Sequence, residues 1–426
     1  MRKNNAKGKI NKLKANIDNK RTRYLLKKYN VNNLEDVKIT LLKDLRDNLR
    51  KGITDKRQKK KCSFKIWDII ICVVVANYAD VYDWKQIEDF ITTHYKWFKS
   101  FLQMTGGVPD HQTIERVFTL INHKELENIL ISFYQNVIHS VRQDDLINID
   151  GRTSNSSKRK KTDYNDGCKA LNVLSAYSNE YGICLASEMI DDKTNEIPTI
   201  PTILERLNIR KCTITWDALN TQTENVAAVV DGKADYVVPI KGNHPTFFEN
   251  LVEYFDDKTV EMIIAGKSKS EYKKYTEKSH SSYITYEYFQ TEDVNWYHDK
   301  KSWKKLNSIG MVKKTIEKNG EKAIEKRYYI SSLYLNIEEF SRAIRNHWSV
   351  ENKLHWHLDF TFKEDKNTTM NKDALMNLQI VNKFTLAGLN KVKQFYDNRS
   401  LQGIRKLISL DFENNILTFL LYLACC

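Results

Sequence analysis

The feature that most constrains the fold is a sequence of short apolar runs that begins at Leu146. Residues 146–150, 170–177 and 183–190 each have the length and composition of a strand, and 178–182 reads as a hairpin turn between the last two. After them the pattern alternates between helix and strand, with a helix near 200–207, a strand at 213–217, a helix near 223–230 and a strand at 235–241.

Hairpin-type strands followed by alternating helices and strands combine antiparallel pairing with parallel crossovers. The sequence therefore predicts an α/β fold: a ribonuclease-H-like mixed sheet flanked by helices. Residues 246–326, which are charged and rich in tyrosine, interrupt the alternation and are interpreted as a β-rich insertion. The core is thus expected in two parts, 141–245 and 327–426, and the second part includes C-terminal helices.

Three acidic residues occupy informative places in this pattern. Asp150 and Asp217 each end a predicted strand, and Glu351 lies in a helical stretch that Asn336 and Glu339 begin as a capping box. Carboxylates are the ligands that magnesium prefers, and two such ions can drive phosphodiester chemistry. Because the chain has 54 acidic residues, the weight of this triple comes from its placement and not from its count.

The positive charge is concentrated at the N-terminus. Residues 1–61 hold 21 Lys or Arg against 6 Asp or Glu, although the net charge of the whole chain is only +14. Such a basic arm suits the phosphate backbone of nucleic acid. A solvated tail remains the alternative.

Residues 62–140 read as a helical domain, with a break at Gly106–Gly107 and a new helix after Asp110. A helix, a glycine turn and a helix that exposes Arg116 indicate a DNA-binding domain, as in helix-turn-helix proteins. An ordinary helical bundle beside the core is equally compatible. No apolar run approaches the roughly 20 residues that span a bilayer, so the sequence predicts a cytoplasmic protein without a membrane partner.

Beyond these patterns, five segments resemble bacterial insertion-sequence transposases of the DDE class, in the branch that includes the H-repeat-associated proteins. They occur in family order and the resemblance covers roughly 60–390. The segments are Asp150–Arg152, Asp192–Pro198, Asp217–Gln222, Asp235–Asn243 and Arg345–Trp356. The block around Glu351 is the most specific of them because it is long.

The resemblance implies that Asp150, Asp217 and Glu351 are catalytic and bind Mg²⁺, with Mn²⁺ as a substitute. It also implies DNA contacts near the metals, for which the candidates are Arg152, Lys193, Lys241, Asn243, Arg345 and His347. Lys241 and Asn243 equally suit a polar turn. His347 and His355 lie one turn on either side of Glu351, so a zinc-binding helix face is the alternative for them.

The expected function is that of a DNA transposase that binds the terminal inverted repeats of its element and catalyses metal-dependent strand cleavage and strand transfer. Its expected partners are the double-stranded element ends and target DNA, bound by a homo-oligomer at the nucleoid. The alternatives are a catalytically idle DNA-binding relic and a metal-dependent nuclease without strand transfer.

Overall fold

The computed structural model describes Lys27 and residues 34–137, 144–159, 167–191, 195–279, 282–347 and 349–425. The chain divides into two compact units that interleave along the sequence. The helical unit comprises Met1–Val141, Ser154–Leu171 and Trp356–Cys426, and the sheet unit comprises Arg142–Thr153 and Asn172–His355. Where the structure is described, no helix is both long and apolar enough to cross a membrane.

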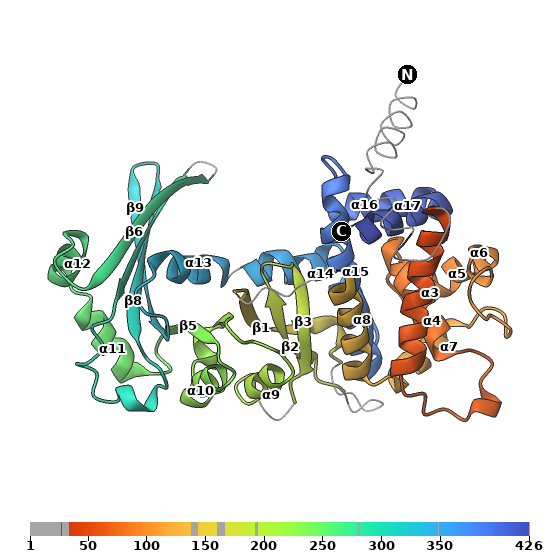
Figure 1. The fold of residues 1–426 in the computed structure, drawn as a ribbon, viewed down its shortest axis with the longest axis horizontal. Coiled ribbons are helices and arrows are strands. Elements are labelled where there is room, and N and C mark those ends of the chain that lie inside the picture. Colours follow the sequence, from red (N-terminus) through yellow and green to blue (C-terminus); the bar gives the residue numbers. More distant parts are fainter. Residues whose placement is uncertain are drawn as a thin grey trace, which may run out of the picture. The chain divides into compact units, whose positions relative to one another are not determined.

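The sheet unit is built on nine strands in the order β3-β2-β1-β4-β5-β9-β8-β7-β6 (Figure 1). The core strands are β1 (Leu146–Ser154), β2 (Leu171–Ser178), β3 (Ile183–Met189), β4 (Thr213–Thr215) and β5 (Asp235–Ile240). β2 and β3 are antiparallel, whereas β1, β4 and β5 pair in parallel. This order confirms the ribonuclease-H-like mixed sheet.

The insertion extends the same sheet. It begins with two helices, α11 (Pro245–Tyr254) and α12 (Asp257–Ile264), and continues as β6 (Ser270–Ser279), β7 (Ser282–Thr291), β8 (Ser308–Lys318) and β9 (Glu321–Ser331), with the short turn η4 (Lys300–Ser302) between β7 and β8. All four strands are antiparallel to their neighbours, and β9 joins the insertion to the core by pairing antiparallel with β5.

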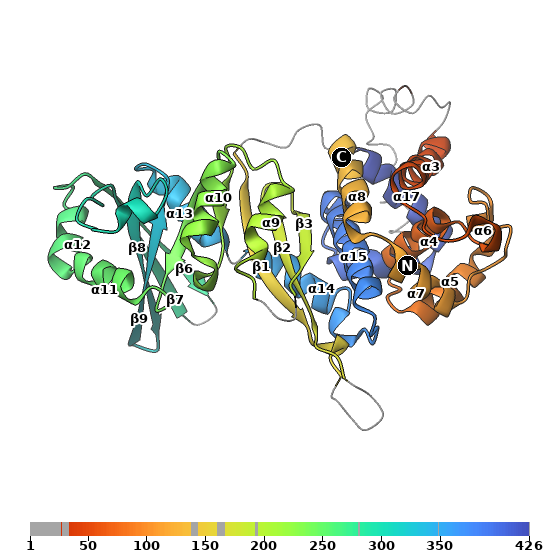
Figure 2. The ribbon, with the colours of Figure 1, turned by 90° about the horizontal axis from the view of Figure 1, so that it is seen from below.

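Side-chain alternation along the core strands gives the sheet two different faces. Ile147 and Ile149 of β1, with Ile214 and Trp216 at β4, pack against α9 (Thr199–Glu205) and α10 (Thr223–Asp231). The other face of the sheet carries Leu146, which packs with residues of α13 (Ile337–His347). Figure 2 shows α9 and α10 lying along these strands.

After α13 the chain does not continue as one regular helix. Ser349 and Val350 are helical, Glu351–His355 forms the π-helix η5, and α14 (Trp356–Phe360) follows. In place of the single predicted helix around Glu351, the chain therefore has an α-helix, a π-helix and a second, short α-helix. At the start of α13 only half of the predicted capping box is confirmed: the Glu339 backbone N–H donates to Asn336 Oδ1 at 3.1 Å, but the Asn336 N–H donates to Gln290 Oε1 instead of Glu339.

The helical unit gathers segments from both ends of the chain. Its N-terminal helices are α3 (Leu34–Gly52), α4 (Ile66–Tyr78), α5 (Trp84–Thr93), α6 (Tyr95–Lys99), α7 (His111–Leu120) and α8 (His123–Val137). Its C-terminal helices are α15 (Lys372–Val392), α16 (Leu401–Leu410) and α17 (Phe412–Cys425), and the short turns η1 (Lys59–Lys61), η2 (Asn155–Ser157), η6 (Glu364–Lys366) and η7 (Lys393–Phe395) complete it. The C-terminal helices, which were predicted as part of the catalytic core, cluster instead with the N-terminal helices.

The second half of the predicted arm is folded. In α3 the side chains of Leu41, Leu42, Leu45 and Leu49 are buried, so residues 34–52 pack as an amphipathic helix. Arg46 and Asp68 form an ion pair of 2.5 Å between α3 and α4. Most of the arm before Leu34 lies outside the described residues.

Arg405 is a buried cation at the centre of the helical unit. Its side chain is fully buried, donates to the Asn77 carbonyl oxygen at 2.7 and 3.0 Å, and lies 3.1 Å from Asp80. Burial lowers the pKa of Arg405 to about 10, while Asp80 opposes that shift. The guanidinium therefore joins α16 to the end of α4.

We predict that Arg405→Ala lowers the free energy of unfolding by about 3–5 kcal/mol, because it leaves buried polar groups of α4 without their partner. Urea denaturation followed by circular dichroism measures the change. Arg399→Ala, at an exposed position on the preceding turn, is the matched control and should shift stability by less than about 0.5 kcal/mol. Equal effects of the two variants would contradict a structural role for Arg405.

Candidate active site

The pairing of β1 with β4 brings two of the three predicted carboxylates together. The parallel register matches Asn148 with Thr215, so Asp150 and Asp217 are both two residues further along. Asp150 and Asp217 lie on the same face of the sheet as Leu146 and Thr213, opposite to α9 and α10. Ligand sites of α/β sheets lie at the carboxyl ends of parallel strands. Asp217 lies just past the end of β4, whereas β1 continues beyond Asp150 to Ser154.

Asp150 has a crowded acidic environment. Burial and the nearby charges of Asp217, Glu196 and Glu351 raise the pKa of Asp150 to about 7. Its Oδ2 atom lies 3.3 Å from His355 Nδ1, and its Oδ1 atom accepts a hydrogen bond of 3.0 Å from the Gly151 N–H. A bound cation would relieve this repulsion between the carboxylates.

Asp217 has the opposite environment. A hydrogen bond from His347 lowers the pKa of Asp217 against the effect of burial, and the charges of Lys241 and Arg327 lower it further. His347 Nε2 lies 3.2 Å from Asp217 Oδ1, and its Nδ1 atom lies 3.3 Å from Thr215 Oγ1. The imidazole is thus held between β4 and the carboxylate, which stays ionised.

Glu351 is the first residue of η5 and its side chain is exposed. Its spacing of four residues from both His347 and His355 places the histidines on either side of it, and each histidine contacts one of the two aspartates. A zinc site would need His347, Glu351 and His355 to face one ion, but His347 points to Asp217 and His355 points to Asp150. Among the described residues, no three His, Cys, Asp or Glu side chains are close enough to hold a metal ion directly.

Glu196 is an acidic neighbour that sequence reasoning did not single out. A Cβ atom at position 151 would lie 2.0 Å from Glu196 Oε1, so glycine at this position makes room for the carboxylate. Asn220 Nδ2 donates to Glu196 Oε2 at 2.6 Å. The signal was present in the sequence, since Glu196 follows the third strand inside a segment that carries the family resemblance.

The predicted DNA-contact residues have different surroundings. Arg345, exposed on α13, pairs with Glu277 at 3.1 Å and lies over the Tyr275 ring at 4.5 Å. Asn243 donates to the Ala218 carbonyl oxygen at 2.8 Å, which is the polar-turn interpretation of this residue. His347 is buried between Thr215 and Asp217.

The remaining candidates are spread over both units. Lys241 is exposed after β5, and Arg152 is half-buried on β1. Lys193 lies outside the described residues. Arg116 belongs to the helical unit, where it lines a hollow with Arg57 and Lys61. Its helix α7 begins as predicted, because Thr113 N–H donates to Asp110 Oδ1 at 2.6 Å.

We predict that the metal-free protein loses stability as the pH rises from about 4 to 7. The folded state keeps the Asp150 proton up to about pH 7, whereas the unfolded state loses it near 3.8. The folded state therefore binds more protons in this window, and stability falls by up to about 1.4 kcal/mol per pH unit.

Urea midpoints of wild type and Asp150→Asn, measured with a chelator across this range, test the assignment. Asp150→Asn should flatten the decline and should be the more stable protein at pH 8. Parallel pH profiles would contradict a raised pKa at Asp150.

Comparison with known proteins agrees with this geometry. Residues 142–380 match the family model described as "Transposase DDE domain", and residues 50–134 match the model "DDE_Tnp_1-associated". The protein named "Putative transposase YncI" from Escherichia coli O157:H7 is 32% identical over 350 residues, which cover 80% of this chain and 86% of that protein.

Two further comparisons differ in strength. "H repeat-associated putative transposase YhhI" from Escherichia coli K12 is 32% identical over 321 residues, covering 74% of this chain and 82% of that protein. A piggyBac transposase synaptic complex with hairpin DNA covers 89% of this chain and 78% of its own at 9% identity, but its TM-score of 0.36 is too low to support an argument. The family model alone spans more than half of the chain, and the chain belongs to the DDE transposase family.

Proposed function

We propose that the protein is an active DNA transposase that binds the terminal inverted repeats of its own element, cleaves phosphodiester bonds at the ends and joins the freed 3′ hydroxyl to target DNA. The observation that carries this proposal is the register of β1 and β4, which places Asp150 and Asp217 side by side. Glu351 follows on the helix over the same face, and its charge acts on Asp150.

The donor set suits hard divalent cations. Asp150, Asp217 and Glu351 offer only carboxylate oxygens, which Mg²⁺ prefers and Mn²⁺ accepts. Bound at these three residues, such ions would activate the attacking water or 3′ hydroxyl and neutralise charge on the leaving oxygen. The raised pKa of Asp150, which is due first to burial and then to the nearby charges of Asp217, Glu196 and Glu351, supports the assignment because a cation would offset both effects.

In this proposal the two histidines act on the carboxylates. His347 fixes the orientation of Asp217 through its contact with Thr215, and His355 contacts Asp150. The carboxylates that would hold the metal are therefore oriented by neighbouring imidazoles, while the Glu351 carboxylate is exposed. The two imidazoles thereby keep the site ordered before metal binds.

DNA would be held by cations around this face. Lys241 and Arg327 are close enough to lower the pKa of Asp217, so a phosphate beside the carboxylates would meet positive charge. Arg152, Lys193, Asn243 and Arg345 are proposed as further contacts, and Arg116 as a contact from the helical unit. The protein is proposed to work as a homo-oligomer on DNA, at the nucleoid in the cytoplasm.

We predict that Asp150→Asn, Asp217→Asn and Glu351→Gln each reduce strand cleavage and strand transfer by at least about 10³-fold while end binding is kept, because each change removes a metal ligand. The assay supplies pre-cut element ends with a free 3′ hydroxyl, a supercoiled plasmid and Mg²⁺ or Mn²⁺. Glu338→Gln is the matched control, since Glu338 is an exposed glutamate of α13 that pairs with Lys273.

The same assay separates the alternatives. Joined products that depend on all three carboxylates support the transposase. Cutting without joining would indicate a nuclease, and binding without either reaction would indicate an idle relic. Normal activity of Glu351→Gln would remove this residue from the ligand set.

A second prediction concerns the basic arm. Residues 1–33 carry 11 Lys or Arg and 1 acidic residue, and they precede the packed helix α3. Deleting them should weaken DNA binding and flatten its salt dependence, because fewer counterions are released on binding.

The measurement is the slope of log affinity against log salt concentration, with and without residues 1–33. Thermal melting of both proteins is the control, since a deletion that ends before α3 leaves the buried leucines in place. An unchanged slope would favour the solvated-tail interpretation.

A further inference from the structure

The end of α13, four residues before Glu351, is held to β1 by a buried side-chain amide. Asn148 Nδ2 donates to the carbonyl oxygens of Asn346 and His347, at 2.5 and 2.6 Å, and its side chain is fully buried. Asn346 and His347 are the last two residues of α13, and the π-helix η5 begins four residues after His347, at Glu351. The last carbonyl groups of an α-helix lack intrahelical partners, and π-helical turns occur often at functional sites.

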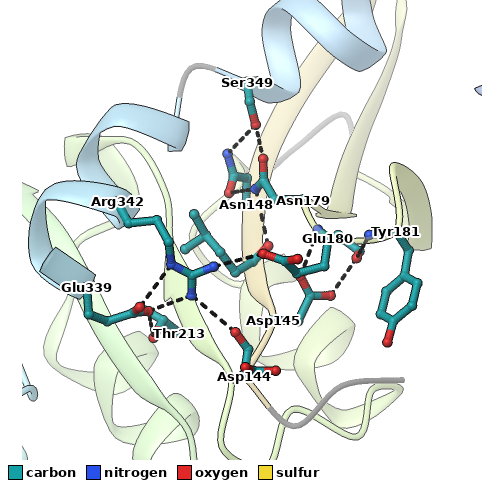
Figure 3. A network of polar contacts seen from close by, with 12 residues as sticks. Asp144, Asp145, Asn148, Asn179, Glu180, Tyr181, Thr213, Glu339, Arg342 and Ser349 are labelled. Carbon is teal, nitrogen blue, oxygen red and sulfur yellow. Dashed lines mark hydrogen bonds and ion pairs between the residues drawn. The ribbon is translucent and has the colours of Figure 1, made fainter. Parts of the chain in front are cut away.

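Two further side chains complete this arrangement (Figure 3). Asn179 Nδ2 donates to Asn148 Oδ1 at 2.6 Å and to the Leu146 carbonyl oxygen at 3.2 Å. Ser349 Oγ donates in turn to Asn179 Oδ1. Asn148, Asn179 and Ser349, called here the polar clamp, therefore join β1, the β2–β3 turn and the helical segment before Glu351.

The clamp allows only one orientation of the Asn148 amide. Its nitrogen faces two carbonyl oxygens and its oxygen faces the Asn179 amide nitrogen, so a flipped Asn148 would place oxygen against oxygen on one side and nitrogen against nitrogen on the other. A buried amide with both ends satisfied in this way fixes the two elements that it joins.

The clamp also lies close in sequence to two of the carboxylates. Asn148 precedes Asp150 by two residues on the same face of β1, a step of about 6.6 Å. His347, whose carbonyl oxygen accepts from Asn148, precedes Glu351 by four residues. We propose that the polar clamp is a positioning device that sets the Glu351 carboxylate opposite Asp150 for metal binding; this inference rests on the proposed function.

A second set of polar side chains attaches α13 to the sheet nearer its start, so the clamp acts only on the end of the helix. Arg342 contacts Glu339 at 2.8 Å and Glu180 at 3.0 Å, and Glu339 accepts a hydrogen bond of 3.0 Å from Thr213 (Figure 3). Because α13 is attached to β4 and to the β2–β3 turn through these residues, loss of the clamp should loosen the Glu351 segment without detaching the helix.

A double-mutant cycle tests the proposal, with Mn²⁺ binding to the purified full-length protein measured by isothermal titration calorimetry. Asn148→Ala should weaken Mn²⁺ binding by about tenfold or more, the usual cost of losing a residue that orients a metal ligand. Glu351→Gln should also weaken it. The double variant should bind no more than about twofold more weakly than Glu351→Gln alone, because Asn148 acts through Glu351.

Asn377→Ala is the matched control for the loss of a buried amide. Asn377 is fully buried in α15 and also bridges two backbone carbonyls, those of Phe118 and Ile121, at 2.8 and 3.0 Å. It should reduce thermal stability while leaving the Mn²⁺ dissociation constant within about twofold of wild type. If Asn148→Ala does not fold, Ser349→Ala, which removes one hydroxyl of the clamp, replaces it in the same cycle.

The outcomes distinguish the positioning role of the clamp from the proposed set of metal ligands. If the effects of Asn148→Ala and Glu351→Gln multiply, or if Asn148→Ala binds Mn²⁺ as wild type does, the clamp does not position Glu351 and the metal site stands without it. If Glu351→Gln alone leaves Mn²⁺ binding unchanged, Glu351 is not a ligand, and both the clamp and the proposed ligand set are overturned.

Discussion

The parallel pairing of β1 with β4 is the constraint on which the sheet unit depends. One register decides that Asp150 meets Asp217, that Asn148 and Thr215 face α13, and that Ile147 and Ile214 enter the core beneath α9 and α10. A slip by one residue would exchange the two faces and bury the carboxylates among isoleucines. The cost of burying unpaired charge therefore selects the register together with hydrophobic packing.

Local sequence patterns predicted those parts of the molecule that depend on local physics. The strand runs, the hairpin turn at 178–182 and the caps at Asp110 and Asn336 all rest on contacts within a few residues, and all are present. The prediction that both aspartates end a strand is confirmed for Asp217, which follows β4, but is wrong for Asp150, because β1 continues to Ser154. Once β1 and β4 are neighbours in the sheet, their parallel pairing brings the two aspartates together.

The features that the sequence did not reveal depend on distant contacts. The π-helix that begins at Glu351 follows the end of α13, which Asn148 holds from about 200 residues away in the chain. The interactions of His347 and His355 with two different aspartates likewise require the assembled sheet. The fold of α3 was hidden because the helix was counted with the basic arm, although α3 itself has nearly balanced charges and four leucines spaced along its buried side.

The interleaving of the two units has a consequence for synthesis on the ribosome. The helices α3–α8 are made first, but α15, with its long buried surface, is made only after the whole sheet unit. Until then the early helices lack the partner that covers their apolar residues, and they are candidates for chaperone binding. A copy of the gene interrupted before α15 would leave the early helices without this partner, so a premature stop within the sheet unit would also affect the helices that are made first.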